Sequence, residues 1–316
     1  VVAEFAGIAG SLELFHLSKY LAVPVCAVLV WLLVVKGNYK SVEKIFLTAS
    51  AFYICYVIAG VLARPAWHDA MVATVRLPSR PAWHANGYTY MVVALIGTTI
   101  APWMQFYLQA SVVEKRIPVK KYAASRWDVI IGSIFTDVVA WFIIVACAAT
   151  LFAHASGSGG APINVPGDAA EAMRPLAGRY AFLLFSFGLF NASFFAASVL
   201  PLSTAYTVCE GLGFESGVDQ TFKQAPFFYW LYTVLIAGGA AVVLLPHFPL
   251  IRITILSQVL NGVLLPIVIV LMLLLIKRKD LMGEHVNTGL FNVVAWATAV
   301  IVILLSLVMM VQSLRA

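Results

Sequence analysis

The chain is a succession of long apolar runs separated by short polar segments, which leaves few folds open to it. Nine runs approach the roughly 20 apolar residues that a helix needs to cross a bilayer. They lie at about 1–18, 20–36, 45–63, 87–113, 128–153, 179–209, 226–246, 249–276 and 289–314. Because the runs are continuous and do not alternate, they predict helices and exclude a membrane barrel. We therefore expect an all-α polytopic membrane protein with a single transmembrane domain over 1–316.

Composition supports this class and excludes soluble ones. Charged residues make up 11% of the 316 residues and hydrophobic residues 62%, whereas soluble proteins average roughly 25% charged. Of the 20 Lys and Arg residues, 12 fall in loops on one side of the predicted membrane, and the denser clusters lie close to span ends. The positive-inside rule makes that side cytoplasmic. The net charge of +6 therefore reflects topology, and we expect no nucleic-acid partner.

The chain starts at Val1, already inside an apolar run, without an initiator Met or a basic leader. We therefore expect it to be the C-terminal part of a longer protein. The four cysteines lie in or at the ends of apolar runs without metal-binding spacing, so packed free thiols are expected. No nucleophile–base pair, H-E-x-x-H motif or Gly-rich phosphate loop is visible. The sequence thus favours a protein that is not an enzyme and has no cofactor.

Pro102 interrupts the fourth apolar run at its middle. A proline removes one backbone donor, and in lipid a broken helix is tolerated only beside protein or a wet cavity. Gly97, Thr98 and Gln105 cluster around this proline. Transporters expose backbone carbonyls to cations at such breaks, although a plain proline kink is the alternative interpretation.

Uncharged amides mark the eighth run. Gln258 and Asn261 are three residues apart, so they share one helix face. Amide oxygens suit a hard cation or its waters, but such side chains also join helices within membranes. Asp137 lies well inside the fifth run, where a carboxylate is costly. It could draw cations into a pathway or bond a neighbouring helix.

Two loops on the external side are long. The first, about 64–86, repeats Arg-Pro-Ala-Trp-His at 64–68 and 80–84, and each copy could start an interfacial helix. The second, about 154–178, is rich in Gly, Ser and Pro and is predicted to be a flexible connector.

The segment 97–116 resembles the sixth helix of the NRAMP divalent-metal transporters, which reads roughly Gly-Ala-Thr-Val-Met-Pro-His, then Tyr-Leu-His-Ser-Ser. The segment 3–9 is similar to the third helix of that family, Ala-Glu-x-Ala-x-Ile-Ala. Segments at 210–211 and 257–266 are similar to the eighth and tenth helices. The resemblance covers nearly the whole chain as helices three to eleven. It implies that the first two helices, with the main metal-binding carboxylate of the family, are absent.

Departures from the family pattern bear on the substrate. Ala101 stands where the family has Met, a soft ligand that favours transition metals. A wider site with oxygen donors suits Mg²⁺, which usually keeps several waters. The pattern resembles the NRAMP-related magnesium transporters, with Mn²⁺ as a possible second substrate. Trp103 replaces a His of the proton route of the family and cannot titrate, so we expect transport without proton coupling.

The resemblance implies a LeuT-type fold with inverted repeats and discontinuous helices, working by alternating access. Its metal site would comprise Thr98, Ala101, Gln105, Gln258 and Asn261. Pro102, Trp103 and Asp137 are the predicted pathway or gating residues. The expected partners are a divalent metal ion and the lipid bilayer, and the protein is expected to be a monomer in a bacterial plasma membrane.

Two other functions remain open at this point. One is a proton-coupled symporter for Mn²⁺ or Fe²⁺, in which Met at position 101 would barely change metal preference. The other is a LeuT-fold amino-acid symporter, which an amino acid would stabilise and a divalent ion would not.

Overall fold

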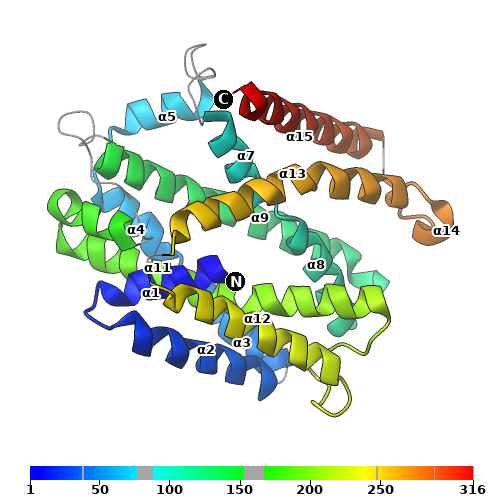
Figure 1. Ribbon diagram of the computed structural model, residues 1–316. Coiled ribbons are helices and arrows are strands. Elements are labelled where there is room, and N and C mark those ends of the chain that lie inside the picture. Colours follow the sequence, from blue (N-terminus) through cyan, green and yellow to red (C-terminus); the bar gives the residue numbers. More distant parts are fainter. Residues whose placement is uncertain (38, 77–87, 153–166, 247, 288, 316) are drawn as a thin grey trace. The chain divides into compact units, whose positions relative to one another are not determined.

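The computed structural model describes residues 1–37, 39–76, 88–152, 167–246, 248–287 and 289–315. In these residues every regular element is a helix (Figure 1). The chain divides into two compact units. The first unit comprises Val1–Arg76 with Phe106–Ile251, and the second comprises Leu77–Gln105 with Arg252–Ala316.

Seven of the nine predicted runs contain a helical segment that could span a membrane, whereas the run 1–18 forms α1, a helix of 12 residues. Seven helical segments are long and apolar enough to cross a membrane, and the helix Lys19–Val35 is apolar but shorter. The elements are α1 Val2–Glu13, α2 Lys19–Val35, α3 Tyr39–Ala51, α4 Ile54–Leu62, α5 Trp67–Val75, α7 Tyr88–Thr99, α8 Pro102–Glu114, α9 Tyr122–Cys147, α11 Gly167–Leu212, α12 Pro226–Leu244, α13 Leu250–Ile276, α14 Lys279–Met282 and α15 Gly289–Arg315. A 3₁₀ turn, Val119–Lys121, precedes α9, and a π-helical turn, Ala148–Phe152, follows it. The prediction of an all-α polytopic membrane protein is confirmed, and the helix pattern is consistent with a LeuT-type fold.

One predicted span is interrupted, and one predicted connector is wrong. The span 45–63 is present as Lys44–Leu62, with a turn at Phe52 and Tyr53 between α3, which ends at Ala51, and α4, which begins at Ile54. The Asn191 amide of α11 donates a 2.8 Å hydrogen bond to the Ala49 carbonyl just before this interruption. The predicted connector 154–178 is helical from Gly167, and Gly178 then kinks α11 with a φ of 81° that favours glycine. Residues 153–166 lie outside the described part of the chain.

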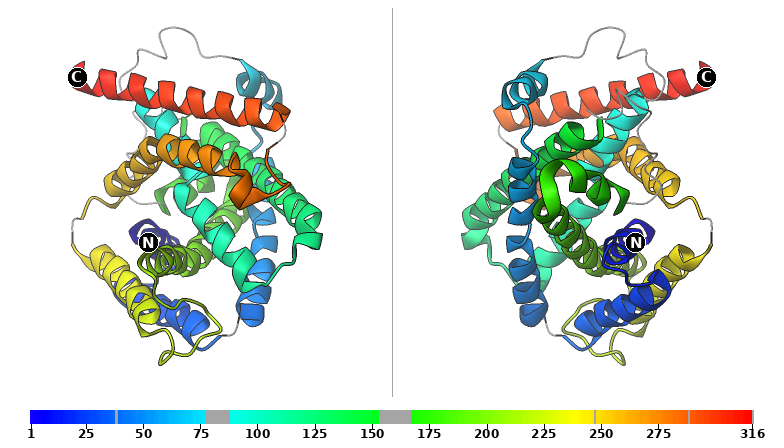
Figure 2. Two further views of the ribbon diagram at one scale, coloured as in Figure 1. Left: turned by 90° about the vertical axis from the view of Figure 1, so that its right-hand side faces the viewer. Right: turned by 90° about the vertical axis from the view of Figure 1, so that its left-hand side faces the viewer.

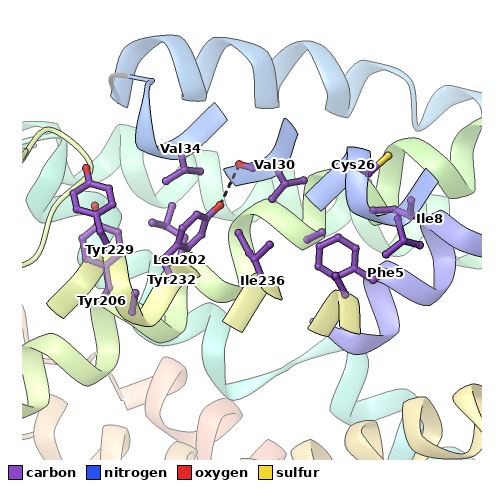
Figure 3. Close-up of a cluster of buried hydrophobic side chains, with 14 of the residues drawn as sticks. Phe5, Ile8, Cys26, Val30, Val34, Leu202, Tyr206, Tyr229, Tyr232 and Ile236 are labelled. Atoms are coloured by element: carbon purple, nitrogen blue, oxygen red, sulfur yellow. Dashed lines mark hydrogen bonds between the residues drawn. The ribbon is translucent and has the colours of Figure 1, made fainter. Parts of the chain in front are cut away.

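Helix α1 forms the centre of the first unit. Its residues from Phe5 to Ser11 are all buried, and it packs against α2, α11 and α12 (Figure 2). Gly7 allows this approach, because a Cβ there would overlap the Ser193 hydroxyl of α11. Membrane helices commonly pack through such small residues. Phe5 of α1 points into the same apolar cluster as Val30 of α2 and Ile236 of α12 (Figure 3).

Buried hydroxyl groups join the helices of the first unit. Tyr229 of α12 donates to the Val218 and Gln220 carbonyls at 3.1 and 2.8 Å, which fixes the segment between α11 and α12. The Tyr232 hydroxyl lies 3.4 Å from the Val30 carbonyl of α2 (Figure 3). These bonds pair polar groups that would otherwise be unsatisfied in an apolar surrounding.

The first Pro-Ala-Trp copy does start a helix, as predicted. Helix α5 begins at Trp67, and the Trp67 ring stacks on Trp141 of α9 with ring centroids 6.3 Å apart. The Trp141 indole N–H also donates to the Thr74 hydroxyl at 2.8 Å. The second copy, at 80–84, lies outside the described residues, and an interfacial location stays a prediction.

The second unit contains α7, the start of α8, and α13 to α15. Its core cluster consists of Val93 and Ala94 of α7, Val259 of α13 and Met309 of α15. Tyr90, Ile255, Val263 and Leu305 pack against this cluster. This unit contains every residue of the predicted metal site.

Candidate cation site

The predicted break in the fourth span is present. Helix α7 ends at Thr99 and α8 begins at Pro102, so Ile100 and Ala101 lie between two helices. The Ile100 N–H still bonds the Ile96 carbonyl at 2.9 Å, and the Ala101 carbonyl accepts the Met104 N–H at 3.1 Å. Pro102 has no N–H, so it cannot supply the helical partner of the Thr98 carbonyl four residues earlier. The break therefore removes the helical donor of a backbone oxygen inside a segment that could span a membrane.

The two amides of α13 form a pair. The Asn261 side-chain N–H donates to Gln258 Oε1 at 3.2 Å, so the shared helix face is confirmed. Both side chains are partly buried. The bond orients the two amides together and leaves the Asn261 Oδ1 lone pairs for another donor or a cation.

Two glycines bring α7 and α13 together next to the break. An ideal Cβ on Gly97 would overlap the Gln258 carbonyl and the Gly262 N–H. An ideal Cβ on Gly262 would lie 2.5 Å from the Val93 carbonyl of α7. The backbones thus touch one turn before the break, on the turn of α13 that carries Gln258 and Asn261. The sequence marks Gly97 only as a neighbour of Pro102, and it carries no signal that singles out Gly262.

The remaining predicted residues have different surroundings. Ala101 and Pro102 are buried, with Ala101 2% exposed, while Gln105 and Trp103 are partly buried. Thr98 is exposed. Asp137 belongs to the first unit, where its side chain on α9 is exposed, and its pathway role stays a prediction. No direct contact between Thr98, Gln105 and the amide pair is established.

The donor chemistry at this site is neutral oxygen. Across the residues that the structure describes, no group of three or more His, Cys, Asp or Glu side chains could hold a metal ion. The oxygen donors of the second unit near the break are the Thr98 carbonyl and the side-chain amides of Gln258 and Asn261. Carbonyl and amide oxygens are the ligands that hard cations accept.

A further polar contact supports the same turn of α13. The Ser306 hydroxyl of α15 lies 3.4 Å from the Gly262 carbonyl, and Ser306 is only 7% exposed. The sequence contained a partial signal, because Pro266 stands four residues after Gly262 and deprives that carbonyl of its helical donor. Nothing in the sequence singles out Ser306 among the serines of the apolar runs as the replacement.

A multi-pass helical protein with a broken span beside carbonyl and amide oxygens has the architecture of a secondary transporter with discontinuous helices. The chain belongs to the Nramp family (natural resistance-associated macrophage protein-like), whose pattern it matches over residues 1–312. The family predicted by resemblance is therefore confirmed. Membership in the magnesium branch and the absence of two preceding helices stay predictions.

Curated relatives carry names that describe transport. The chain is 27% identical over 265 residues to the divalent metal cation transporter MntH of Clostridium acetobutylicum, covering 81% of this chain and 56% of that protein. It is 27% identical over 322 residues to MntH of Deinococcus radiodurans, covering 96% and 68%. MntH 1 of Pseudomonas aeruginosa is 26% identical, covering 94% and 68%. The chain thus spans between 56% and 68% of the length of these relatives.

Proposed function

We propose that this protein moves a divalent metal ion across the membrane by alternating access, with Mg²⁺ as the principal substrate and Mn²⁺ as a second. One observation carries the proposal. The span broken at Ile100–Ala101 lies, through Gly97, against the turn of α13 that presents Gln258 and Asn261. Membership of the Nramp family and the names of the relatives support a divalent metal ion as the transported species.

The oxygen donors near position 101 support a preference for Mg²⁺. Position 101 carries a methyl group, which offers no ligand, and the nearby groups are amide and carbonyl oxygens. Soft thioether or thiolate ligands would favour transition metals, whereas neutral oxygen favours hard ions. Mg²⁺ sheds water reluctantly, so a site lined by small residues would accept the ion with part of its hydration shell.

The residue at position 103, a tryptophan, supports transport without proton coupling. An indole has no titratable group near neutral pH, so Trp103 cannot receive and release a proton during the cycle. The ion would then move down its own electrochemical gradient.

Ligand-dependent thermal stabilisation of the purified full-length protein tests this function. An ion that binds only the folded state raises the midpoint of unfolding, and the gain in stability grows with the logarithm of the free ion concentration above its Kd. We expect stabilisation by Mg²⁺ and by Mn²⁺, and loss of both effects in Asn261→Leu. Ser257→Ala is the matched control, because the Ser257 hydroxyl bonds the Thr254 carbonyl of its own helix. Stabilisation by amino acids and none by either ion would instead identify an amino-acid symporter.

A proton-coupled transition-metal symporter is the second candidate. The relatives are named divalent metal cation transporters, and those names do not separate Mg²⁺ from other divalent ions. Stabilisation by Mn²⁺ with no response to Mg²⁺ would favour this candidate over the one we propose.

A further inference from the structure

Pro266 creates a gap in the hydrogen bonding of α13. In an uninterrupted helix the N–H of residue 266 would bond the carbonyl of Gly262, but proline has no N–H. In a membrane, an unpaired carbonyl is costly, and neighbouring Ser and Thr side chains commonly replace the missing donor. Ser306 of α15 does so here, with its hydroxyl oxygen 3.4 Å from the Gly262 carbonyl.

Gly262 also lies at the contact between α13 and α7. A Cβ on Gly262 would lie 2.5 Å from the Val93 carbonyl and 2.7 Å from a Val93 methyl group. A Cβ on Gly97 would meet the Gln258 carbonyl and the Gly262 N–H, which face each other across one helical turn. One turn of α13 therefore carries the amide pair and contacts the backbone of α7. The same turn accepts a hydrogen bond from the Ser306 hydroxyl of α15.

We propose that Ser306 is a positioning residue for the cation site, acting through Gly262. This inference rests on the proposed function, because it assigns Ser306 to the ion site that the amide pair helps to form. Ser306 does not touch the ion. Its hydroxyl bonds the Gly262 carbonyl, and so fixes the turn of α13 that carries Gln258 and Asn261 beside α7.

The expected effect of losing the hydroxyl is specific. Without Ser306 the Gly262 carbonyl loses the hydroxyl that replaces its missing helical donor, so the helix at Pro266 can bend and carry the amide pair away from its place beside α7. Ion affinity should fall, while the rate at saturating ion should change little. Ser306→Ala should raise the KM for Mg²⁺ and Mn²⁺ about threefold to tenfold, the range expected for one interhelical hydrogen bond in a membrane.

The first test measures ion uptake by full-length protein in liposomes over a range of Mg²⁺ and Mn²⁺ concentrations. Ser306→Thr retains a hydroxyl and should restore the KM toward the wild-type value. Thr298→Val is the matched control on the same helix, because the Thr298 hydroxyl bonds the Val294 carbonyl within α15. Its KM should stay unchanged. A KM in Ser306→Ala equal to that of wild type would overturn the inference.

A double substitution separates positioning from general packing. Pro266→Ala restores an N–H four residues after Gly262, so the carbonyl regains its helical donor and Ser306 becomes dispensable. In the Pro266→Ala background, Ser306→Ala should therefore leave the KM unchanged. An equal rise in KM in both backgrounds would show that Ser306 acts by packing alone. This comparison also keeps the test decisive if Ser306→Ala by itself does not fold.

The two proposals fail in different ways. A wild-type protein that moves no divalent ion would overturn the proposed function, and with it the assignment of Ser306 to a cation site. Normal wild-type uptake with a KM insensitive to Ser306→Ala would overturn only the role of Ser306.

Discussion

By the predicted resemblance, position 101 of this chain carries Ala where the family has Met. Ala101 is 2% exposed and lies in the break between α7 and α8, and its carbonyl caps the first turn of α8 by accepting the Met104 N–H. Its methyl group brings no ligand to an ion, so the side chain acts by its small size and its lack of sulfur.

Introducing a soft ligand at this position should change ion preference. In Ala101→Met a thioether would reach the break, favouring Mn²⁺ and narrowing the space for a hydrated Mg²⁺. We expect the ratio of the KM values for the two ions to shift toward Mn²⁺ about tenfold, equivalent to about 1.4 kcal/mol. Uptake of each ion into liposomes measures the ratio. Ala101→Leu, of similar bulk without sulfur, is the control, and an equal shift in both variants would contradict the explanation.

A buried tyrosine tests the hydrogen bonds of the first unit. Tyr229 is 1% exposed and donates to two carbonyls of the segment that precedes α12. Tyr229→Phe should lower the free energy of unfolding by about 1–3 kcal/mol, because buried carbonyls lose their donor. Thermal or denaturant unfolding in detergent measures the loss. Tyr180→Phe is the control, since Tyr180 is 78% exposed, and equal stability of both variants would refute the assignment.

Among the elements of the second unit, α7 and α13 approach each other closely at one crossing. The contact requires glycine on both helices, at Gly97 and Gly262. Alanine or leucine would favour an ordinary apolar helix more than glycine does, so the requirement for glycine comes from the contact and not from helix formation.

Adding one methyl group at the crossing should be enough to disturb the site. In Gly97→Ala the new methyl would overlap the Gln258 carbonyl, so α13 must move away from the break. We expect the apparent affinity for Mg²⁺, measured from the stabilisation of the folded protein, to fall at least tenfold, or about 1.4 kcal/mol. Gly132→Ala on α9 is the control, because a Cβ there meets nothing within 4 Å. Unchanged ion affinity in Gly97→Ala would show that the crossing does not support the site.

The elements also show what the sequence can and cannot predict. Apolar runs located the helices, and Pro102 located the break, because both signals are local along the chain. The interruption between Ala51 and Ile54 left no such signal, since neither proline nor glycine stands there. The contacts of Gly97 with α13 and of Ser306 with Gly262 join segments far apart in sequence. Such contacts depend on packing, which hydrophobicity patterns do not encode.

At the scale of the whole molecule, the protein is a multi-pass integral membrane protein of the Nramp family. Its chain forms two compact units, and the boundary at Gln105–Phe106 falls within α8, one turn after the break. All five predicted metal-site residues belong to the second unit. The selection of these residues came from the resemblance together with the polar pattern, and their joint action on an ion remains a prediction.

Uptake by the full-length protein in liposomes tests whether it transports Mg²⁺ without proton coupling. The liposomes would carry a Mg²⁺-sensitive or a Mn²⁺-sensitive dye together with an internal pH probe. We predict saturable Mg²⁺ uptake with no change in internal pH, and Mn²⁺ uptake that competes with it. Mn²⁺ uptake accompanied by acidification, with no Mg²⁺ signal, would contradict this account and identify a proton-coupled transition-metal transporter.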